Sequence, residues 1–237
     1  MATAFDLNLG GLIDPEGDPS AIAFIDLAGM EPGGEGKAHT RGQIDTLANA
    51  VARGLTRRGL VRGDAVAILA ENSVDYLGAY KGIMRAGMVA VPINYRQTAR
   101  TVGHIVKDSE TRLIFADQGR WHLCPDGVPV IDISDAGENG FGGLLDPGSF
   151  RIVAPAPRET AMTLHTSGST GMPKSVMLSH EGQLFALSRW ASDAAELARH
   201  RLLVAAPQYH MNALFISKLA LTYSAGVVLL PRFDVEA

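Results

Sequence analysis

Short apolar stretches alternate with amphipathic stretches along most of this chain. Ala65–Leu69 is a continuous apolar run, the pattern of a strand that is buried on both faces of a sheet. Before it, apolar residues recur every three or four positions over Ile44–Leu55, which predicts a helix with one buried face. Thr40 and Gln43 stand where a capping box would begin that helix.

The same alternation continues towards residue 116. Two further helices are predicted, from Ser73 to about Gly87 and over 98–107, with strands at 88–91 and 113–116. Strands joined by helices at this spacing indicate βαβ crossovers and a mostly parallel sheet. More elements follow: strands are expected at 128–131, 161–165, 176–178, 202–206 and 227–230, and helices at 181–197 and 212–223.

These patterns divide the chain into four parts. Residues 1–39 are loop-rich, 40–135 form a first α/β unit, 136–160 form a linker, and 161–237 form a second α/β unit. The chain stops directly after the last expected strand, so we expect the second unit to be truncated. The predicted fold class is α/β, with mostly parallel sheets flanked by helices in two sheet units.

Composition and charge exclude several classes of protein. The chain has 237 residues, of which 46% are apolar, and this apolar share excludes disorder for most of it. The net charge of −4 gives no electrostatic footprint for nucleic acid or an anionic membrane. Four arginines lie close in sequence and are interpreted as a solvated helix face: Arg53, Arg57, Arg58 and Arg62.

Cysteine and histidine positions suggest no metal site. Cys124 is alone, so it can form neither an internal disulfide nor a cysteine-rich zinc site, and we interpret it as an apolar filler. Four histidines lack metal-ligand spacing and are expected at the surface: His39, His104, His122 and His200. No run approaches the ~18 apolar residues of a membrane span, and the N-terminus does not resemble a signal peptide. The expected compartment is the cytoplasm.

The segment Thr166–Lys174 holds four hydroxyl side chains, two glycines and one lysine, directly after an expected strand. Glycines let backbone N–H groups turn towards an anion, hydroxyls add donors, and lysine adds a positive charge. These are the parts of a polyphosphate cradle, although a polar turn has a similar composition.

Two common motifs do not fit this segment. In the P-loop of NTPases the second glycine would fall at position 173, where Pro173 has no N–H to donate. That loop also starts a helix at its lysine, whereas Val176–Leu178 is expected to be a strand. A nucleophile elbow fails because neither Ser167 nor Ser169 has glycine two residues away on both sides.

Leu164–His180 resembles the signature loop of adenylate-forming enzymes, which include acyl- and aryl-CoA synthetases, luciferases and the adenylation domains of peptide synthetases. Pro173 is expected in that pattern. Three other segments are similar to segments of the family: Gly63–Ser73, Gly87–Asn94 and Pro207–His210. The resemblance therefore covers about residues 40–237 and implies part of the large N-terminal domain of such an enzyme.

The resemblance also implies a reaction and its cofactors. A carboxylic acid reacts with ATP to give an acyl-adenylate and pyrophosphate, and coenzyme A then forms a thioester; Mg²⁺ assists, and one setting is fatty acid metabolism. By position, seven residues would contact the ATP phosphates: Thr166, Ser167, Gly168, Ser169, Thr170, Gly171 and Lys174. Tyr209 and His210 would contact the acyl substrate.

Two positions depart from the family pattern, and a third is interpreted as structural. His165 stands where the family usually has an aromatic residue, and Ser175 replaces a glycine, which would be strained if that position needs a positive φ. His180 is interpreted as a structural residue that caps a helix starting at Glu181.

Residues 181–237 lack the family's adenine-binding strand, its acidic Mg²⁺ ligand, its ribose-binding aspartate and its C-terminal domain with a second lysine. We therefore expect the main catalytic residues beyond residue 237 and expect this chain alone to be inactive. Its partners would be the carboxylic acid and the missing C-terminal portion, with a homodimer left open. A non-catalytic truncated module is the alternative, and a P-loop phosphotransferase, which requires a helix at Lys174, is a third reading.

Overall fold

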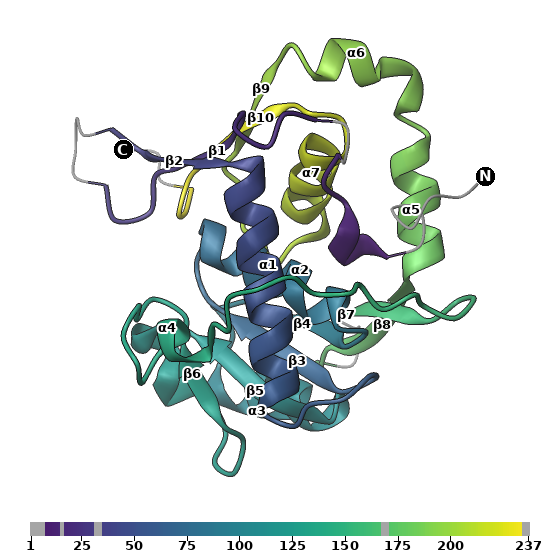
Figure 1. Ribbon diagram of the computed structural model, residues 1–237. Coiled ribbons are helices and arrows are strands. Elements are labelled where there is room, and N and C mark those ends of the chain that lie inside the picture. The colour runs from purple at the N-terminus through teal and green to yellow at the C-terminus, as the bar shows by residue number, and fades with distance from the viewer. Residues whose placement is uncertain (1–7, 15–16, 31–34, 167–170, 234–237) are drawn as a thin grey trace.

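The computed structural model describes residues 8–14, 17–30, 35–166 and 171–233. Its strands are β1 (Ile22–Asp26), β2 (Lys37–Thr40), β3 (Ala65–Leu69), β4 (Val89–Pro92), β5 (Thr111–Ala116), β6 (Val130–Asp132), β7 (Thr160–Thr166), β8 (Lys174–Ser179), β9 (Arg201–Val204) and β10 (Gly226–Leu229). They form a six-stranded sheet in the order β6-β5-β3-β4-β7-β8 and a four-stranded sheet in the order β2-β1-β10-β9 (Figure 1). Only the β1–β2 and β7–β8 pairs among these strands are antiparallel, which confirms the expected fold class.

Helices flank both sheets. The α-helices are α1 (Arg41–Arg57), α2 (Val74–Arg85), α3 (Ala99–Asp108), α4 (Phe141–Leu144), α5 (His180–Ser188), α6 (Ala194–Leu197) and α7 (Met211–Thr222). Short 3-10 helices are η2 (Leu9–Gly11), η3 (Gln118–Leu123) and η4 (Ala191–Asp193). In this described part of the chain, no helix combines the length and apolar character needed to cross a membrane.

The six-stranded sheet is buried on both faces at β3. Val66 and Ile68 point into the larger core, which α1 and α2 cover, while Ala67 and Leu69 pack into a second cluster with α3. This two-sided burial is the reason why β3 is a continuous apolar run. The predicted capping box of α1 is present, because the Thr40 and Gln43 side chains each bond the other's backbone N–H.

Strand pairing differs from the expectation in two places. The segment expected to be loop-rich contains β1 and β2, and β1 pairs in parallel with β10, about 200 residues away along the chain. β7 and β8, expected in the second unit, join β4 in the first sheet. Local apolar patterns identify a strand but not its partner. The boundaries proposed at 39, 135 and 160 stay predictions.

The helix expected over 181–197 is interrupted. α5 ends at Ser188, whose hydroxyl donates to the carbonyl of Phe185 at 2.8 Å, and η4 and α6 follow as separate turns. Serine hydroxyls compete with the helical backbone bonds in this way, which favours a helix end. Figure 1 shows α5, α6 and β9 following one another around the outside of α7.

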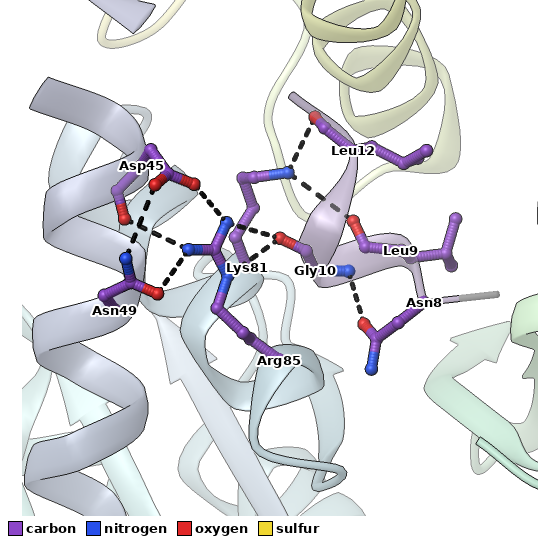
Figure 2. A network of polar contacts seen from close by, with 8 residues as sticks. All are labelled: Asn8, Leu9, Gly10, Leu12, Asp45, Asn49, Lys81 and Arg85. Atoms are coloured by element: carbon purple, nitrogen blue, oxygen red, sulfur yellow. Dashed lines mark hydrogen bonds and ion pairs between the residues drawn. The ribbon is translucent and has the colours of Figure 1, made fainter. Parts of the chain in front are cut away.

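Two buried basic side chains of α2 hold the N-terminal segment (Figure 2). Arg85 donates to the carbonyl oxygen of Gly10 at 2.9 Å and pairs with Asp45 of α1 at 2.8 Å. Lys81 donates to the carbonyl of Leu12 at 3.0 Å, and burial holds the pKa of Lys81 well below its usual value. These contacts join α1, α2 and η2 into one unit.

The arginines expected on a solvated helix face are mostly engaged. Arg53 pairs with Asp146 at 3.2 Å, and Arg57 donates to the carbonyl of Gly143 at 3.3 Å. Arg62 forms a two-bond ion pair with Glu159. Arg53 and Arg57 therefore hold residues 143–146 against α1.

Candidate functional site

The candidate loop is held between two antiparallel strands. Thr166, the last residue of β7, lies opposite Lys174, the first residue of β8. Lys174 is exposed at this position. Four predicted phosphate contacts, Ser167, Gly168, Ser169 and Thr170, lie outside the described residues. Because Lys174 begins a strand and not a helix, the P-loop phosphotransferase reading is wrong.

The backbone conformations beside the loop explain why position 171 is a glycine and show whether Ser175 is strained. Gly171 has φ +92°, in the region that only glycine adopts easily, and no described atom lies within 4 Å of where a Cβ would stand. Ser175 lies in β8 and is not among the described residues with positive φ. The replacement of the usual glycine by Ser175 therefore places no strain on the backbone.

The predicted acyl contacts lie at the same edge of the sheet as the loop. β4 and β7 are parallel neighbours, so their carboxyl ends share one edge. Tyr95 follows β4, and its ring meets the buried ring of Tyr209 edge-on, with 5.1 Å between centroids. Burial raises the pKa of Tyr209. His210 is exposed, and its ring lies 4.5 Å from that of Tyr209.

Asn72 fixes the segment that carries these two residues, and the sequence analysis assigned it no role. Its side-chain oxygen accepts from the backbone N–H of Gln208 at 2.5 Å, and its amide donates to the carbonyls of Ala206 and Leu230 at 3.0 and 2.8 Å. Asn72 is 1% exposed and follows β3, so it links the carboxyl ends of both sheets. A polar residue three positions after a buried strand was the available signal.

His180 has a structural role different from the one expected. The helix α5 begins at His180, and its cap is Ser179, whose hydroxyl accepts from the N–H of Gly182 at 3.1 Å. The His180 ring accepts from the backbone N–H of Leu9 at 3.0 Å. Burial lowers the pKa of His180 to about 4, so the ring is neutral at pH 7.

His104 is a second correction, because it is half-buried and not at the surface. Its Nε2 donates to the carbonyl of Pro173 at 3.1 Å, directly beside the candidate loop. His39 in β2 is likewise only partly exposed, whereas His122 and His200 are exposed, as expected. In the described ranges, no group of three or more His, Cys, Asp or Glu side chains could hold a metal ion.

A hydroxyl- and glycine-rich loop at the carboxyl edge of a mostly parallel sheet is typical of nucleotide-binding α/β domains. The chain belongs to the family of AMP-binding enzymes, which it matches over residues 14–237. It is 33% identical over 209 residues to the long-chain-fatty-acid–CoA ligase FadD13 of Mycobacterium tuberculosis, covering 82% of this chain and 40% of that protein. It is also 31% identical to a 3-hydroxybenzoate–CoA ligase of an Aromatoleum species, covering 69% of this chain and 33% of that protein.

Solved structures agree with this assignment. ATP-bound MatB from Rhodopseudomonas palustris superposes with a TM-score of 0.84 at 27% identity, covering 96% of this chain and 46% of MatB. The N-terminal domain of FACL13 from Mycobacterium tuberculosis superposes with a TM-score of 0.81 at 26% identity, covering 96% of this chain and 58% of that chain. The chain thus corresponds to the N-terminal portion of these enzymes and spans less than half the length of the complete relatives.

Proposed function

We propose that this chain forms the phosphate-binding and acyl-contacting part of an ATP-dependent acid–thiol ligase. In that reaction a carboxylate oxygen attacks the α-phosphorus of ATP, and pyrophosphate leaves. The thiol of coenzyme A then attacks the acyl carbonyl and displaces AMP. The observation that carries the proposal is the hairpin that sets Lys174 opposite Thr166 at the carboxyl edge of the sheet, within a chain of this family.

The donor set at this edge fits a polyphosphate. Lys174 offers an exposed ammonium group, Thr166 a hydroxyl, and Gly171 a backbone that can turn its N–H towards an anion. We assign the same role to Ser167, Gly168, Ser169 and Thr170 from the sequence motif. Mg²⁺, when bound, would neutralise charge on the triphosphate. The protein's contribution to adenylation is then alignment and charge stabilisation of the leaving pyrophosphate.

For the acid, we propose contacts with Tyr209 and His210. The buried Tyr209 ring offers an apolar wall, and the exposed His210 beside it offers a polar rim. The relatives are named for a long-chain fatty acid and for an aromatic acid. A panel of fatty and hydroxybenzoic acids is therefore the appropriate first test of substrate class.

Lys174→Ala tests the phosphate assignment. In a protein that carries this chain together with the rest of the family fold, we expect ATP affinity to fall by about tenfold to hundredfold, since a charge-assisted contact is worth about 1.5–3 kcal/mol. ATP–pyrophosphate exchange with the acid panel is the measurement. Lys107→Ala, an exposed lysine on α3, is the matched control. Unchanged ATP affinity and adenylation rate in Lys174→Ala would contradict the proposal.

We further propose that the 237 residues alone do not turn over, because the chain spans about 40% of the ligases it matches. Pyrophosphate release from ATP by this chain, with the same acids, is the direct measurement. Release at rates typical of the complete enzymes would refute this part of the proposal. The cytoplasm remains the predicted compartment.

A further inference from the structure

Helix α3 touches the β7–β8 hairpin on both sides of the candidate loop. On the β7 side, Asp108 lies 3.2 Å from Nε2 of His165, the residue before Thr166. On the β8 side, Nε2 of His104 donates to the carbonyl of Pro173 at 3.1 Å, the residue before Lys174. One helix therefore contacts the residue next to each described phosphate-binding side chain.

The two helical residues are spaced for this task. His104 and Asp108 are four positions apart, so they lie on the same face of α3, one turn from each other. A different face of the helix, carrying Val102, Ile105 and Val106, packs against the sheet. The helix is thus fixed on the core by apolar contacts and is free to present a polar pair to the hairpin.

His165 is held tightly by this arrangement. Its side chain is only 3% exposed, and its Nδ1 atom is buried with no hydrogen-bond partner among the described residues. Asp108 accepts from Nε2, so the ring has one strong partner and no alternative on its other nitrogen. Burying an unpaired polar atom is costly, and the Asp108 contact is what fixes the orientation of this ring.

We propose that α3 is a clamp that positions the phosphate-binding hairpin, with His104, Asp108 and His165 as positioning residues. Ladder pairing holds Thr166 opposite Lys174, but β7 is in register with its sheet neighbour β4 only at Met162, which leaves the loop-side end of the hairpin free to move relative to the sheet. The clamp removes that freedom by bonding both strands' loop-side ends to one rigid helix. This inference rests on the proposed phosphate-binding role of Thr166 and Lys174.

The experiment uses the full 237-residue chain and two readouts. Backbone hydrogen exchange at 160–166 and 171–179, without ligand, reports the hairpin directly. Calorimetric titration with inorganic tripolyphosphate reports phosphate binding. The variants are His104→Ala and Asp108→Ala, with His104→Gln and Asp108→Asn as rescues that keep a donor or an acceptor. Lys107→Ala, an exposed neighbour on α3, is the control, and melting temperatures verify folding.

We expect each alanine variant to speed exchange in the hairpin and to weaken tripolyphosphate binding by about fivefold, the effect of losing one hydrogen bond. The rescue variants and Lys107→Ala should stay near the unsubstituted chain. Asp108→Ala combined with His165→Phe should change exchange and affinity little more than either single substitution does, because each removes the same Asp108–His165 contact.

Unchanged hairpin exchange in both alanine variants would overturn the clamp. Faster exchange with unchanged tripolyphosphate affinity would overturn the positioning role. If the unsubstituted chain binds no tripolyphosphate, the proposed phosphate role of the loop fails and the positioning role with it, while exchange alone still decides whether the clamp exists.

Discussion

His180 and Lys218 are buried ionisable side chains, and each makes folding depend on pH. His180 is 3% exposed and Lys218 is 1% exposed. Burial lowers the pKa of both below their usual values, to about 4 for His180 and about 7 for Lys218. In both cases the unfolded chain binds a proton more readily than the folded chain, so stability rises with pH between the two pKa values.

For His180 this interval runs from the usual histidine value of 6.5 down to about 4. We expect the free energy of unfolding to fall by about 3 kcal/mol as pH drops across it, from this group alone. His180→Asn keeps an acceptor for the N–H of Leu9 but does not titrate. Urea unfolding at pH 7, 5.5 and 4 should show a smaller loss for this variant, and equal losses in the two proteins would contradict the prediction.

Lys218 acts in the alkaline range. Its Nζ donates to Oε1 of Gln183 at 2.7 Å, and burial lowers its pKa to about 7. We expect Lys218→Met to raise the free energy of unfolding below pH 7, by an amount on the order of 4 kcal/mol, and to have little effect near pH 10.5. Chemical denaturation at pH 6, 8 and 10 measures this. Lys107→Met, at an exposed lysine, is the control substitution.

Helices α1 and α2 pack closely because glycine stands at two successive turns of α2. A Cβ at Gly82 would lie 2.5 Å from Val51 and 2.9 Å from the carbonyl of Ala48, and one at Gly78 would lie 2.4 Å from Leu47. At Gly82 the close atoms are the Cβ of Val51 and a backbone oxygen, so a side chain there would require one helix to move. The α1–α2 contact also holds Asp45 within reach of Arg85, so this packing supports the buried polar contacts of the N-terminal segment.

Gly82→Ala should therefore destabilise the chain by about 1–3 kcal/mol, the cost of overpacking a core. Gly103→Ala is the matched control, because Gly103 lies in α3 and no described atom is within 4 Å of its missing Cβ. There we expect a gain of about 0.5–1 kcal/mol from better helix propensity. Urea denaturation measures both, and a neutral Gly82→Ala would show that the helices adjust without cost.

Elements whose cause is local could be predicted from the sequence. The apolar run of β3 and the capping box of α1 are of this kind, and so is the motif that places Gly171 and Lys174 beside a strand. Contacts between distant segments could not. A charge such as Arg85 in a helical pattern ordinarily indicates a solvated face, whereas here the carbonyl of Gly10 in the N-terminal segment accepts two hydrogen bonds from its buried guanidinium.

At the candidate site too, contacts between distant segments could not be predicted from the sequence. Asn72 reaches Gln208 across 136 positions, and His104 reaches Pro173 across 69. Neither contact leaves a periodic signal in the sequence. The predicted phosphate and acyl residues could be named one by one from a motif, but the side chains that orient them become visible only when the two sheets and α3 are in place.

At the scale of the whole molecule, large apolar side chains lie exposed on an edge strand of each sheet and on α5, which contacts β8. Met177 of β8 is 73% exposed and Phe185 of α5 is 66% exposed, while Leu203 of β9 is 62% exposed. β8 and β9 each end a sheet in the described part of the chain. Apolar side chains beside an open strand edge favour association. The 19% share of charged residues, below the usual share of about 25%, does little to oppose it.

We therefore expect the 237-residue chain to self-associate as its concentration rises. The double substitution Met177→Lys with Phe185→Lys should reduce this self-association without lowering the melting temperature. Sedimentation velocity over a concentration series measures it. Val61→Lys is the control, since Val61 is 63% exposed and lies between α1 and β3, outside both edge strands. In a protein that carries the rest of the family fold, we expect Met177→Lys with Phe185→Lys to destabilise the folded state, because the added segments would cover these positions and bury the two charges. A chain that sediments as a monomer throughout would show that these side chains are ordinary surface.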